Sequence, residues 1–117
     1  MSIHKFEDII AWQKSQNLAV SIYKNFNLSK DFGFRDQITR ASVSISNNIA
    51  EGFERGSNAD FVRFLYIALA SNSEVRSMLY LSKKLNYLQC DIADTLIEMS
   101  NEISRMLYGL IKSMTNS

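Results

Sequence analysis

The fold is decided by residues 36–52, whose sequence is DQITRASVSISNNIAEG and which contain no proline. Helical spacing places the small and polar side chains of this stretch three and four positions apart, on one face of a helix. This polar stripe consists of Gln37, Ala41, Ser44, Asn48, Glu51 and Arg55. Beside it lies an apolar stripe of Phe34, Ile38, Ile45, Ile49 and Phe53. A helix with so little purely solvent-facing surface is expected to pack on more than one side.

Three breaks divide the chain into four helical segments. The chain has no proline and only four glycines, so the breaks are placed in the polar and glycine clusters between the segments. The predicted helices cover residues 6–26, 32–53, 58–86 and 91–113. Because the connections are short, successive helices are expected to run antiparallel. The prediction is an all-α fold, a single domain over residues 1–117 with four antiparallel helices around one core.

The other three segments also carry apolar stripes with the helical period of about 3.6 residues. In the first segment the stripe is Ile9, Trp12, Gln16, Ala19, Ile22, Tyr23 and Phe26. In the third it is Phe61, Phe64, Leu65, Ala68, Val75, Leu79 and Leu85. In the fourth it is Ile92, Leu96, Met99, Ile103, Met106, Leu107 and Leu110. These side chains are expected to form the core.

The composition indicates a globular protein. Hydrophobic residues make up 46% and charged residues 21% of the chain, which is not the composition of a disordered segment. No apolar run approaches the ~20 residues needed to cross a bilayer, and the first residues lack the apolar segment of a signal peptide. We therefore expect a cytoplasmic protein that does not enter a membrane. Its one cysteine, Cys90, is interpreted as a small residue near a helix start.

Polar residues on the second predicted helix have candidate partners on the third. The candidate polar network or subunit interface consists of Gln37, Arg40, Ser44, Asn48, Glu51, Arg55, Ser71 and Glu74. The arginines are included because an unpaired buried carboxylate is strongly destabilising. We interpret the set as a hydrogen-bond network that fixes the register of the bundle or the contact between subunits. A contact with a ligand or a nucleic acid is the alternative.

The patterns that catalysis and metal binding require are not found. His4 is the one histidine and lies near the chain end, where a general base lacks a fixed partner. A di-metal site in a helical bundle needs Glu-x-x-His on two helices, and the sequence has no such motif. Neither of the glycine-rich phosphate-binding motifs occurs. We therefore expect neither an enzyme nor a bound metal or cofactor.

The net charge is +1, but the charges are unevenly distributed along the chain. Residues 1–30 and 57–89 each carry +2, whereas residues 31–56 carry −1 and residues 90–117 carry −2. Such segregation can produce a basic face. The candidate nucleic-acid contacts are Lys14, Lys24, Lys30, Arg35, Arg63, Arg76, Lys83 and Lys84. Contacts between these residues and phosphates would be independent of base sequence and sensitive to salt.

Four stretches of the chain resemble a known family. The stretch QITRASVSISNNIAEG at 37–52 is similar to the signature of the bacterial four helix bundle proteins, also known as 23S rRNA-intervening sequence proteins. FEDIIAWQKS near the start, FLYIALASNSEVRSML at 64–79 and MLYGLI near the end match other parts of the family pattern. The chain departs from that pattern at Ser46, where proline is usual, and at Ala70, where glycine is common.

The resemblance implies an up-and-down four-helix bundle that assembles into a homopentamer. It also implies kinship with the accessory variability proteins of diversity-generating retroelements, which are pentameric barrels with basic surfaces that bind nucleic acid. None of the family members is known as an enzyme.

From the resemblance and the charges together, we expect a bacterial, non-enzymatic, oligomeric accessory factor that binds RNA or DNA without sequence preference. Five copies in a ring would multiply the effect of a weak basic patch. The alternative is an interaction scaffold whose partner is another protein and whose basic residues confer solubility. The small net charge favours the scaffold, whereas the segregation of charge favours the polyanion binder.

Overall fold

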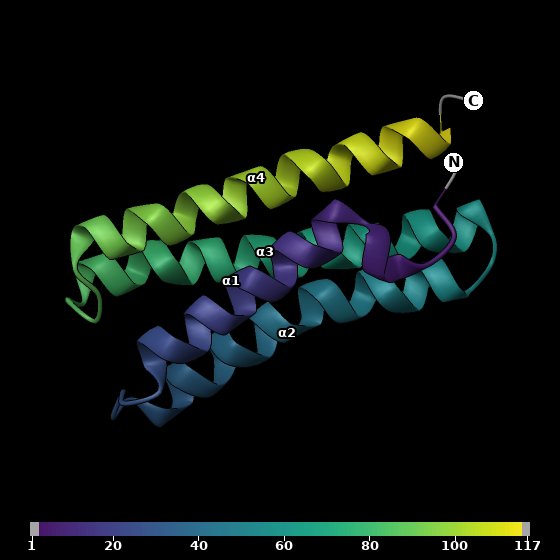
Figure 1. Cartoon of the computed structure of the whole chain (residues 1–117). Helices are drawn as coiled ribbons and strands as arrows, with labels where there is room; N and C mark the ends of the chain where they lie inside the picture. Colours follow the sequence, from purple (N-terminus) through teal and green to yellow (C-terminus); the bar gives the residue numbers. More distant parts are fainter. Residues whose placement is uncertain (1–2, 116–117) are drawn as a thin grey trace.

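The computed structural model describes residues 3–115, which contain four α-helices (Figure 1). These are α1 (Ile10–Phe26), α2 (Phe32–Glu54), α3 (Asn58–Lys84) and α4 (Cys90–Thr115), preceded by a short 3-10 turn at Phe6–Asp8. Each helix packs against the next in the chain, and α4 returns to contact α1. No strand occurs in the described range. The fold is therefore an antiparallel, up-and-down four-helix bundle, and the predicted fold class is confirmed.

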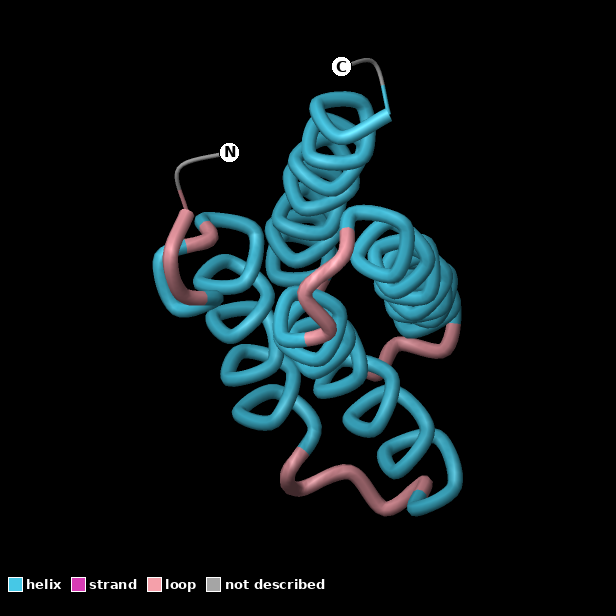
Figure 2. Tube along the Cα trace, turned by 90° about the vertical axis from the view of Figure 1, so that its right-hand side faces the viewer, coloured by secondary structure: helices cyan, strands magenta, loops and turns pink. Residues whose placement is uncertain are grey.

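The bundle is elongated, with principal extents of 45 × 20 × 19 Å. Figure 2 shows the helices turned toward the viewer, with the connections at the two ends of the bundle. The connections α1–α2 and α3–α4 lie at one end, and the α2–α3 connection lies at the other, near both chain termini (Figure 1). We name the first of these the loop end, defined by the connections at residues 27–31 and 85–89.

The helix bounds agree with the prediction to within two residues, except at the start of the first helix. The segment predicted as one helix over 6–26 begins as an α-helix only at Ile10. Ile9, between the 3-10 turn and α1, is extended, with φ −75° and ψ 118°. Its side chain enters the core and is only 2% exposed. The prediction of one continuous helix is therefore wrong at its first turn.

Local hydrogen bonds explain where two of the helices begin. Asp31 Oδ1 accepts a hydrogen bond from Phe34 N at 3.1 Å and caps α2. Ser57 Oγ accepts one from Asp60 N at 3.2 Å and caps α3. After α3, Asn86 adopts a φ of 60°, which asparagine tolerates better than most residues do, and the chain turns there.

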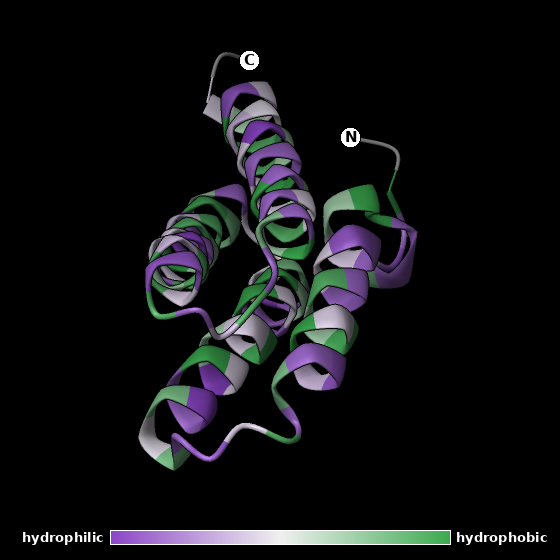
Figure 3. Cartoon of the chain, turned by 90° about the vertical axis from the view of Figure 1, so that its left-hand side faces the viewer, coloured by the Kyte–Doolittle hydropathy of each residue, from purple (hydrophilic) through white to green (hydrophobic). Residues whose placement is uncertain are grey.

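The core of α2 follows the predicted apolar stripe. Ile38, Ile45 and Ile49 are fully buried. Phe34 and Phe53, at the two ends of the stripe, pack against the core while remaining partly exposed. In Figure 3, hydrophobic residues lie largely on the sides of the helices that face one another, and hydrophilic residues lie on the outer sides. Burial of this one face is the main source of helix stability.

The predicted core face of the first segment is correct in part. Ile9, Ile22 and Phe26 are buried and Trp12 packs against the core, but Gln16 is exposed and Tyr23 is 51% exposed. The buried face continues instead through Leu18 to two small residues, Ser15 and Ala11. Small side chains let α1 approach its neighbours closely, and the Ser15 hydroxyl is satisfied by donating to the Ala11 carbonyl at 2.7 Å.

Most residues of the stripes predicted on the last two helices are buried in the core, and a few at the edges of the stripes are partly exposed. On α3, Leu85 is 44% exposed because the helix ends one residue earlier. On α4, Met99 and Met106 lie at the edge of the core. The buried residues of α4 are Ala93, Leu96, Ile97, Ser100, Ile103, Leu107, Ile111 and Met114.

One close contact fixes the distance between α2 and α3. Gly52 is buried near the end of α2. A Cβ atom at this position would lie 2.5 Å from the Cβ of Phe64 and 3.2 Å from a ring carbon of Phe61. Glycine is therefore needed here for the close approach of the two helices, and this explains its place at the end of the segment that decides the fold.

Candidate functional site

Polar side chains of α2 are hydrogen-bonded to α3 at two points. Ser44 Oγ and Ser71 Oγ lie 2.9 Å apart. Gln37 Nε2 donates to Glu74 Oε2 at 3.0 Å. Within α2, Asn48 Nδ2 donates to the carbonyl oxygen of Ser44 at 2.8 Å and to its hydroxyl at 3.0 Å. The structure thus brings together five of the eight residues of the candidate polar network.

The other three residues of that network lie outside these hydrogen bonds. Glu51 and Arg40 are exposed, and neither takes part in an ion pair within residues 3–115. The Arg55 guanidinium lies over the Phe64 ring, 5.1 Å from its centroid. The expected pairing of an arginine with a buried carboxylate is wrong, because Glu51 and Glu74 are exposed and water solvates their charge.

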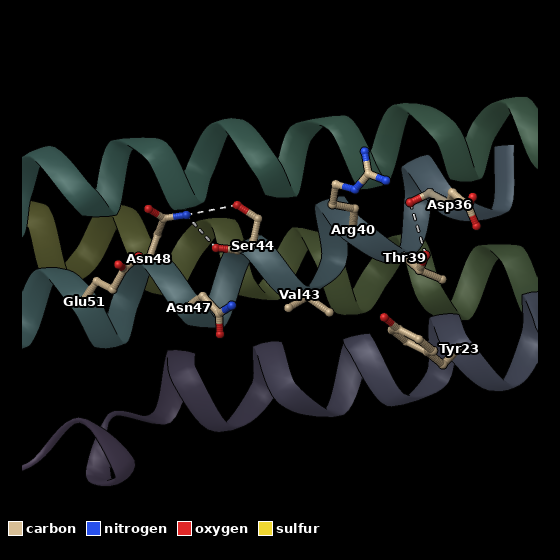
Figure 4. A pocket seen from close by; sticks show the side chains of 9 residues that line it. All are labelled: Tyr23, Asp36, Thr39, Arg40, Val43, Ser44, Asn47, Asn48 and Glu51. Atoms are coloured by element: carbon tan, nitrogen blue, oxygen red, sulfur yellow. Dashed lines mark hydrogen bonds between the residues drawn. The ribbon is translucent and has the colours of Figure 1, made fainter. Parts of the chain in front are cut away.

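An open groove of about 510 Å³ follows the outer side of α2 (Figure 4). It is lined by Tyr23, Asp36, Thr39, Arg40, Val43, Ser44, Asn47, Asn48 and Glu51. Figure 4 shows Tyr23 on α1 and the other lining side chains on α2, with the Arg40 side chain extending toward α3. The lining offers amide, hydroxyl, carboxylate and guanidinium groups without an activated nucleophile, so it suits hydrogen bonding to a polar partner.

A second polar cluster, which the stripes did not predict, lies between α3 and α4. Asn72 is fully buried, and its Nδ2 donates to the Ser100 carbonyl at 2.9 Å and to Ser104 Oγ at 2.8 Å. Ser100 Oγ donates to Asn72 Oδ1 at 2.9 Å. Arg76 Nη1 donates to Ser104 Oγ at 3.1 Å. Every buried side-chain nitrogen and oxygen in the described range has a hydrogen-bond partner.

The eight candidate nucleic-acid contacts fall into three groups. Arg76 is engaged in the cluster between α3 and α4. Four cations form ion pairs: Lys14 with Glu102 (3.1 Å), Arg35 with Asp36 (3.6 Å), Arg63 with Asp60 (3.4 Å) and Lys83 with Asp94 (2.7 Å). Lys24, Lys30 and Lys84 make no ion pair with any described residue. Exposed ion pairs contribute only about 0–1 kcal/mol, so they compete weakly with a phosphate for the same cation.

The fold gathers five of the eight cations at the loop end. These are Lys24, Lys30, Arg35, Lys83 and Lys84. Four aspartates lie at the same end, so residues 24–36 and 83–94 together carry a net charge of +1. The hydrogen bond from Lys83 Nζ to Asp94 Oδ1 raises the pKa of Lys83 above its ordinary value and keeps this side chain charged. Phe32 adds an aromatic ring that is 60% exposed, beneath the Arg35 guanidinium at 4.8 Å.

Two contacts tie the connections of the loop end together. The Tyr87 hydroxyl donates to Asp31 Oδ2 at 2.7 Å. The Tyr87 and Phe34 rings meet edge to face, with 5.3 Å between their centroids. The hydrogen bond from Tyr87 lowers the pKa of Asp31, and the same bond raises the pKa of Tyr87. These contacts hold the two connections together, and with them the helix ends that carry the cations.

Residues 3–115 contain no group of three or more His, Cys, Asp or Glu side chains that could hold a metal ion. Cys90 is an exposed free thiol at the start of α4, and His4 is exposed. Among the helices described, none is long and apolar enough to cross a membrane. The candidate residues that the structure brings together lie on the groove along α2 and at the loop end.

Comparison with known proteins identifies the family. Residues 7–109 match the family model of the 23S rRNA-intervening sequence protein. A similar solved structure is that of a protein of unknown function from the S23 ribosomal protein family of Bacteroides thetaiotaomicron VPI-5482. The two chains are 34% identical, with a TM-score of 0.82, and the match covers 87% of this chain and 98% of that chain. Among curated proteins, none matches this chain. Because the family model spans most of its length, the chain belongs to the 23S rRNA-intervening sequence protein family.

Proposed function

We propose that the chain is a non-enzymatic accessory factor that self-associates and binds nucleic acid at its loop end, without preference for base sequence. The observation that supports this is the gathering of five of the eight candidate cations at that end. Three of them, Lys24, Lys30 and Lys84, have no carboxylate partner within residues 3–115.

The mechanism is electrostatic. Lysines that contact phosphates release counterions from the nucleic acid, and the affinity then depends steeply on salt. The exposed Phe32 ring adds a surface on which a base can stack, since stacking tolerates every base. One loop end with a net charge of +1 binds weakly. Self-association multiplies it, and the ring of five implied by the family resemblance would present five such ends to one strand.

A protein-binding scaffold is the second candidate, and a specific observation favours it. Four of the eight candidate cations are paired with carboxylates, and Arg76 is hydrogen-bonded between helices. The groove on α2 offers a continuous polar surface to a protein partner instead. In this alternative the unpaired lysines are solvated and maintain solubility.

Binding of labelled single-stranded DNA and RNA, titrated at about 50 and 200 mM salt, tests the proposal. The loop-end variant is Lys24→Gln/Lys30→Gln/Lys84→Gln. The matched control is Lys5→Gln/Arg55→Gln/Lys112→Gln, which removes the same charge from the opposite end of the bundle. We expect the wild type and the control to bind with a steep salt dependence, and the loop-end variant to lose most of both affinity and slope. Absence of binding at the lower salt, or equal loss in the two variants, contradicts the proposal.

A further inference from the structure

Exposed apolar side chains gather with the cations at the loop end. Leu28, on the α1–α2 connection, is 87% exposed, and Phe32, at the start of α2, is 60% exposed. On the α3–α4 connection, Leu85 and Tyr87 are 44% and 38% exposed. Contacts with phosphates make no use of apolar side chains, whereas unstacked bases pack against them. The loop end therefore carries a feature that phosphate contacts alone do not explain.

An open pocket of about 480 Å³ lies between the two connections of the loop end. It is lined by Asn25, Phe26, Leu28, Ser29, Lys30, Asp31 and Tyr87. Pockets that hold small molecules have volumes of about 300–1,000 Å³, so this one has room for a single base. Leu28 and Tyr87 supply exposed apolar surface to it.

The lining of this pocket carries no net charge. Lys30 and Asp31 are its two charged residues, and their charges cancel. The two carboxylate oxygens of Asp31 already accept hydrogen bonds, from Phe34 N at 3.1 Å and from the Tyr87 hydroxyl at 2.7 Å. A neutral lining suits an uncharged base. A phosphate is instead attracted to the lysines of the loop end that lie outside the pocket and have no carboxylate partner within residues 3–115.

Two side chains of the lining keep hydrogen-bonding groups for a base. Asn25 Nδ2 donates to the Ser21 carbonyl at 2.8 Å, and the second amide hydrogen and Oδ1 have no partner in the described range. Ser29 Oγ accepts a hydrogen bond from Asp31 N at 3.3 Å, so its own hydrogen remains available as a donor. An amide and a hydroxyl each serve as donor or acceptor, so they can bond to the edge of any base.

We infer that this pocket takes up one unstacked base of a single-stranded nucleic acid, while the lysines around it bind the flanking phosphates. Leu28 and Tyr87 pack against the base. Asn25 and Ser29 hydrogen-bond its edge. A duplex keeps its bases paired and stacked, and extruding one of them costs free energy. The inference rests on the proposed function and makes a single strand the preferred partner of the loop end.

Phosphate contacts alone would not produce this preference. Double-stranded DNA carries one negative charge per about 1.7 Å of its axis, about twice the density of one of its strands. A surface of lysines therefore binds a duplex at least as well as a single strand of the same length. Tighter binding of the single strand has to come from contacts with the bases.

A membrane surface is another partner that lysines and exposed apolar side chains can bind. The pocket favours the nucleic acid over the membrane. Acyl chains offer no hydrogen-bonding group to Asn25 or Ser29, whereas the edge of every base does.

The test measures the binding of several probes at about 50 mM salt. These are a labelled DNA single strand, the duplex of the same length, an abasic strand of the same length and charge, and vesicles of phosphatidylcholine and phosphatidylserine. We expect the wild type to bind the single strand about tenfold more tightly than the duplex or the abasic strand. Binding to the vesicles should be weaker than binding to the single strand.

The pocket variant is Asn25→Ala/Leu28→Ala, which removes two exposed lining side chains without changing the charge. We expect its affinity for the single strand to fall about tenfold, to that for the abasic strand, and its affinity for the duplex to stay unchanged. The matched control, Asn17→Ala/Val20→Ala, removes an exposed asparagine and an exposed apolar side chain of α1 outside the pocket and should bind as the wild type does. Circular dichroism verifies that both variants keep their helices.

The outcomes separate this inference from the proposed function. Absence of binding to every nucleic acid contradicts the proposed function and the inference together. Equal affinities for the single strand, the duplex and the abasic strand overturn the inference alone, and so do equal affinities of the two variants for the single strand. Tighter binding to the vesicles than to the single strand overturns both, since the loop end would then bind a membrane surface.

Discussion

Replacement of Asn72 tests whether the polar cluster between α3 and α4 stabilises the bundle. Asn72 is 0% exposed, and its side chain takes part in three hydrogen bonds of 2.8–2.9 Å with Ser100 and Ser104. Asn72→Ala removes all three and leaves the Ser100 carbonyl without its side-chain donor. Ser104 Oγ keeps the hydrogen bond from Arg76 at 3.1 Å, so the loss is partly compensated.

We therefore expect a loss of about 2 kcal/mol in the free energy of unfolding, within the range of about 1–3 kcal/mol for buried groups left unpaired. For a chain of this size, this corresponds to a fall of roughly 8 °C in the melting temperature. Urea denaturation followed by circular dichroism measures the change. Asn17→Ala, at an exposed position of α1, is the matched control and should change stability by less than about 0.5 kcal/mol.

A double-mutant cycle identifies the cause of the loss. Asn72→Ala and Ser104→Ala share a hydrogen bond of 2.8 Å, so their effects should be non-additive by about 0.5 kcal/mol or more. An Asn72→Ala variant as stable as the Asn17→Ala control, or strictly additive effects in the cycle, would refute the view that this cluster holds α3 and α4 in register.

Three further predictions concern other parts of the fold. Gly52→Ala should destabilise the bundle by about 1–3 kcal/mol, because the added Cβ would lie 2.5 Å from the Cβ of Phe64. The control Gly109→Ala, at an open helical position, should leave stability unchanged or raise it, and thermal melts compare the two variants. The pKa of Asp31 is lowered in the folded state, so the contribution of Asp31 to stability is present above its unfolded-state pKa and is lost as the pH falls through its folded-state pKa. Tyr87→Phe removes the hydrogen bond and should reduce this loss of stability in acid. An unchanged loss of stability in acid would contradict the role of the hydrogen bond. The pKa of Tyr87 is raised in the folded state, so the contribution of Tyr87 to stability is present below its unfolded-state pKa and is lost as the pH rises through its folded-state pKa. Wild type and Tyr87→Phe should therefore differ less in stability at alkaline pH than at neutral pH.

Much of the fold could be predicted because α2 carries an unambiguous pattern. Ile38, Ile45 and Ile49 have the helical period and no competing apolar face, and all three are fully buried. The same spacing placed Ser44 opposite Ser71, where the structure has a hydrogen bond of 2.9 Å. Helix α1 was harder because its apolar residues fit two faces. The buried face of α1 is set by the extended conformation of Ile9 and by the small residues Ala11 and Ser15. A search for periodic large apolar residues does not detect a face made of small ones.

The candidate site was harder to predict than the fold. A cation's position in the sequence does not show whether a neighbouring helix supplies a partner, as Ser104 of α4 does for Arg76. A signal for the cluster between α3 and α4 was nevertheless present. Asn72 lies between Ala68 and Val75 on an apolar stripe, and a polar residue at such a position needs a partner across the interface. The meeting of two connections at the loop end follows from helix order and not from any local motif.

The most direct test of the proposed function is a map of amide chemical shifts during titration of isotope-labelled protein with single-stranded DNA or RNA at about 50 mM salt. The account predicts that the shifts cluster in residues 24–35 and 83–89, and that they disappear at about 200 mM salt. Shifts confined to the groove along α2 or to the opposite end of the bundle, or no shifts at the lower salt, would contradict it.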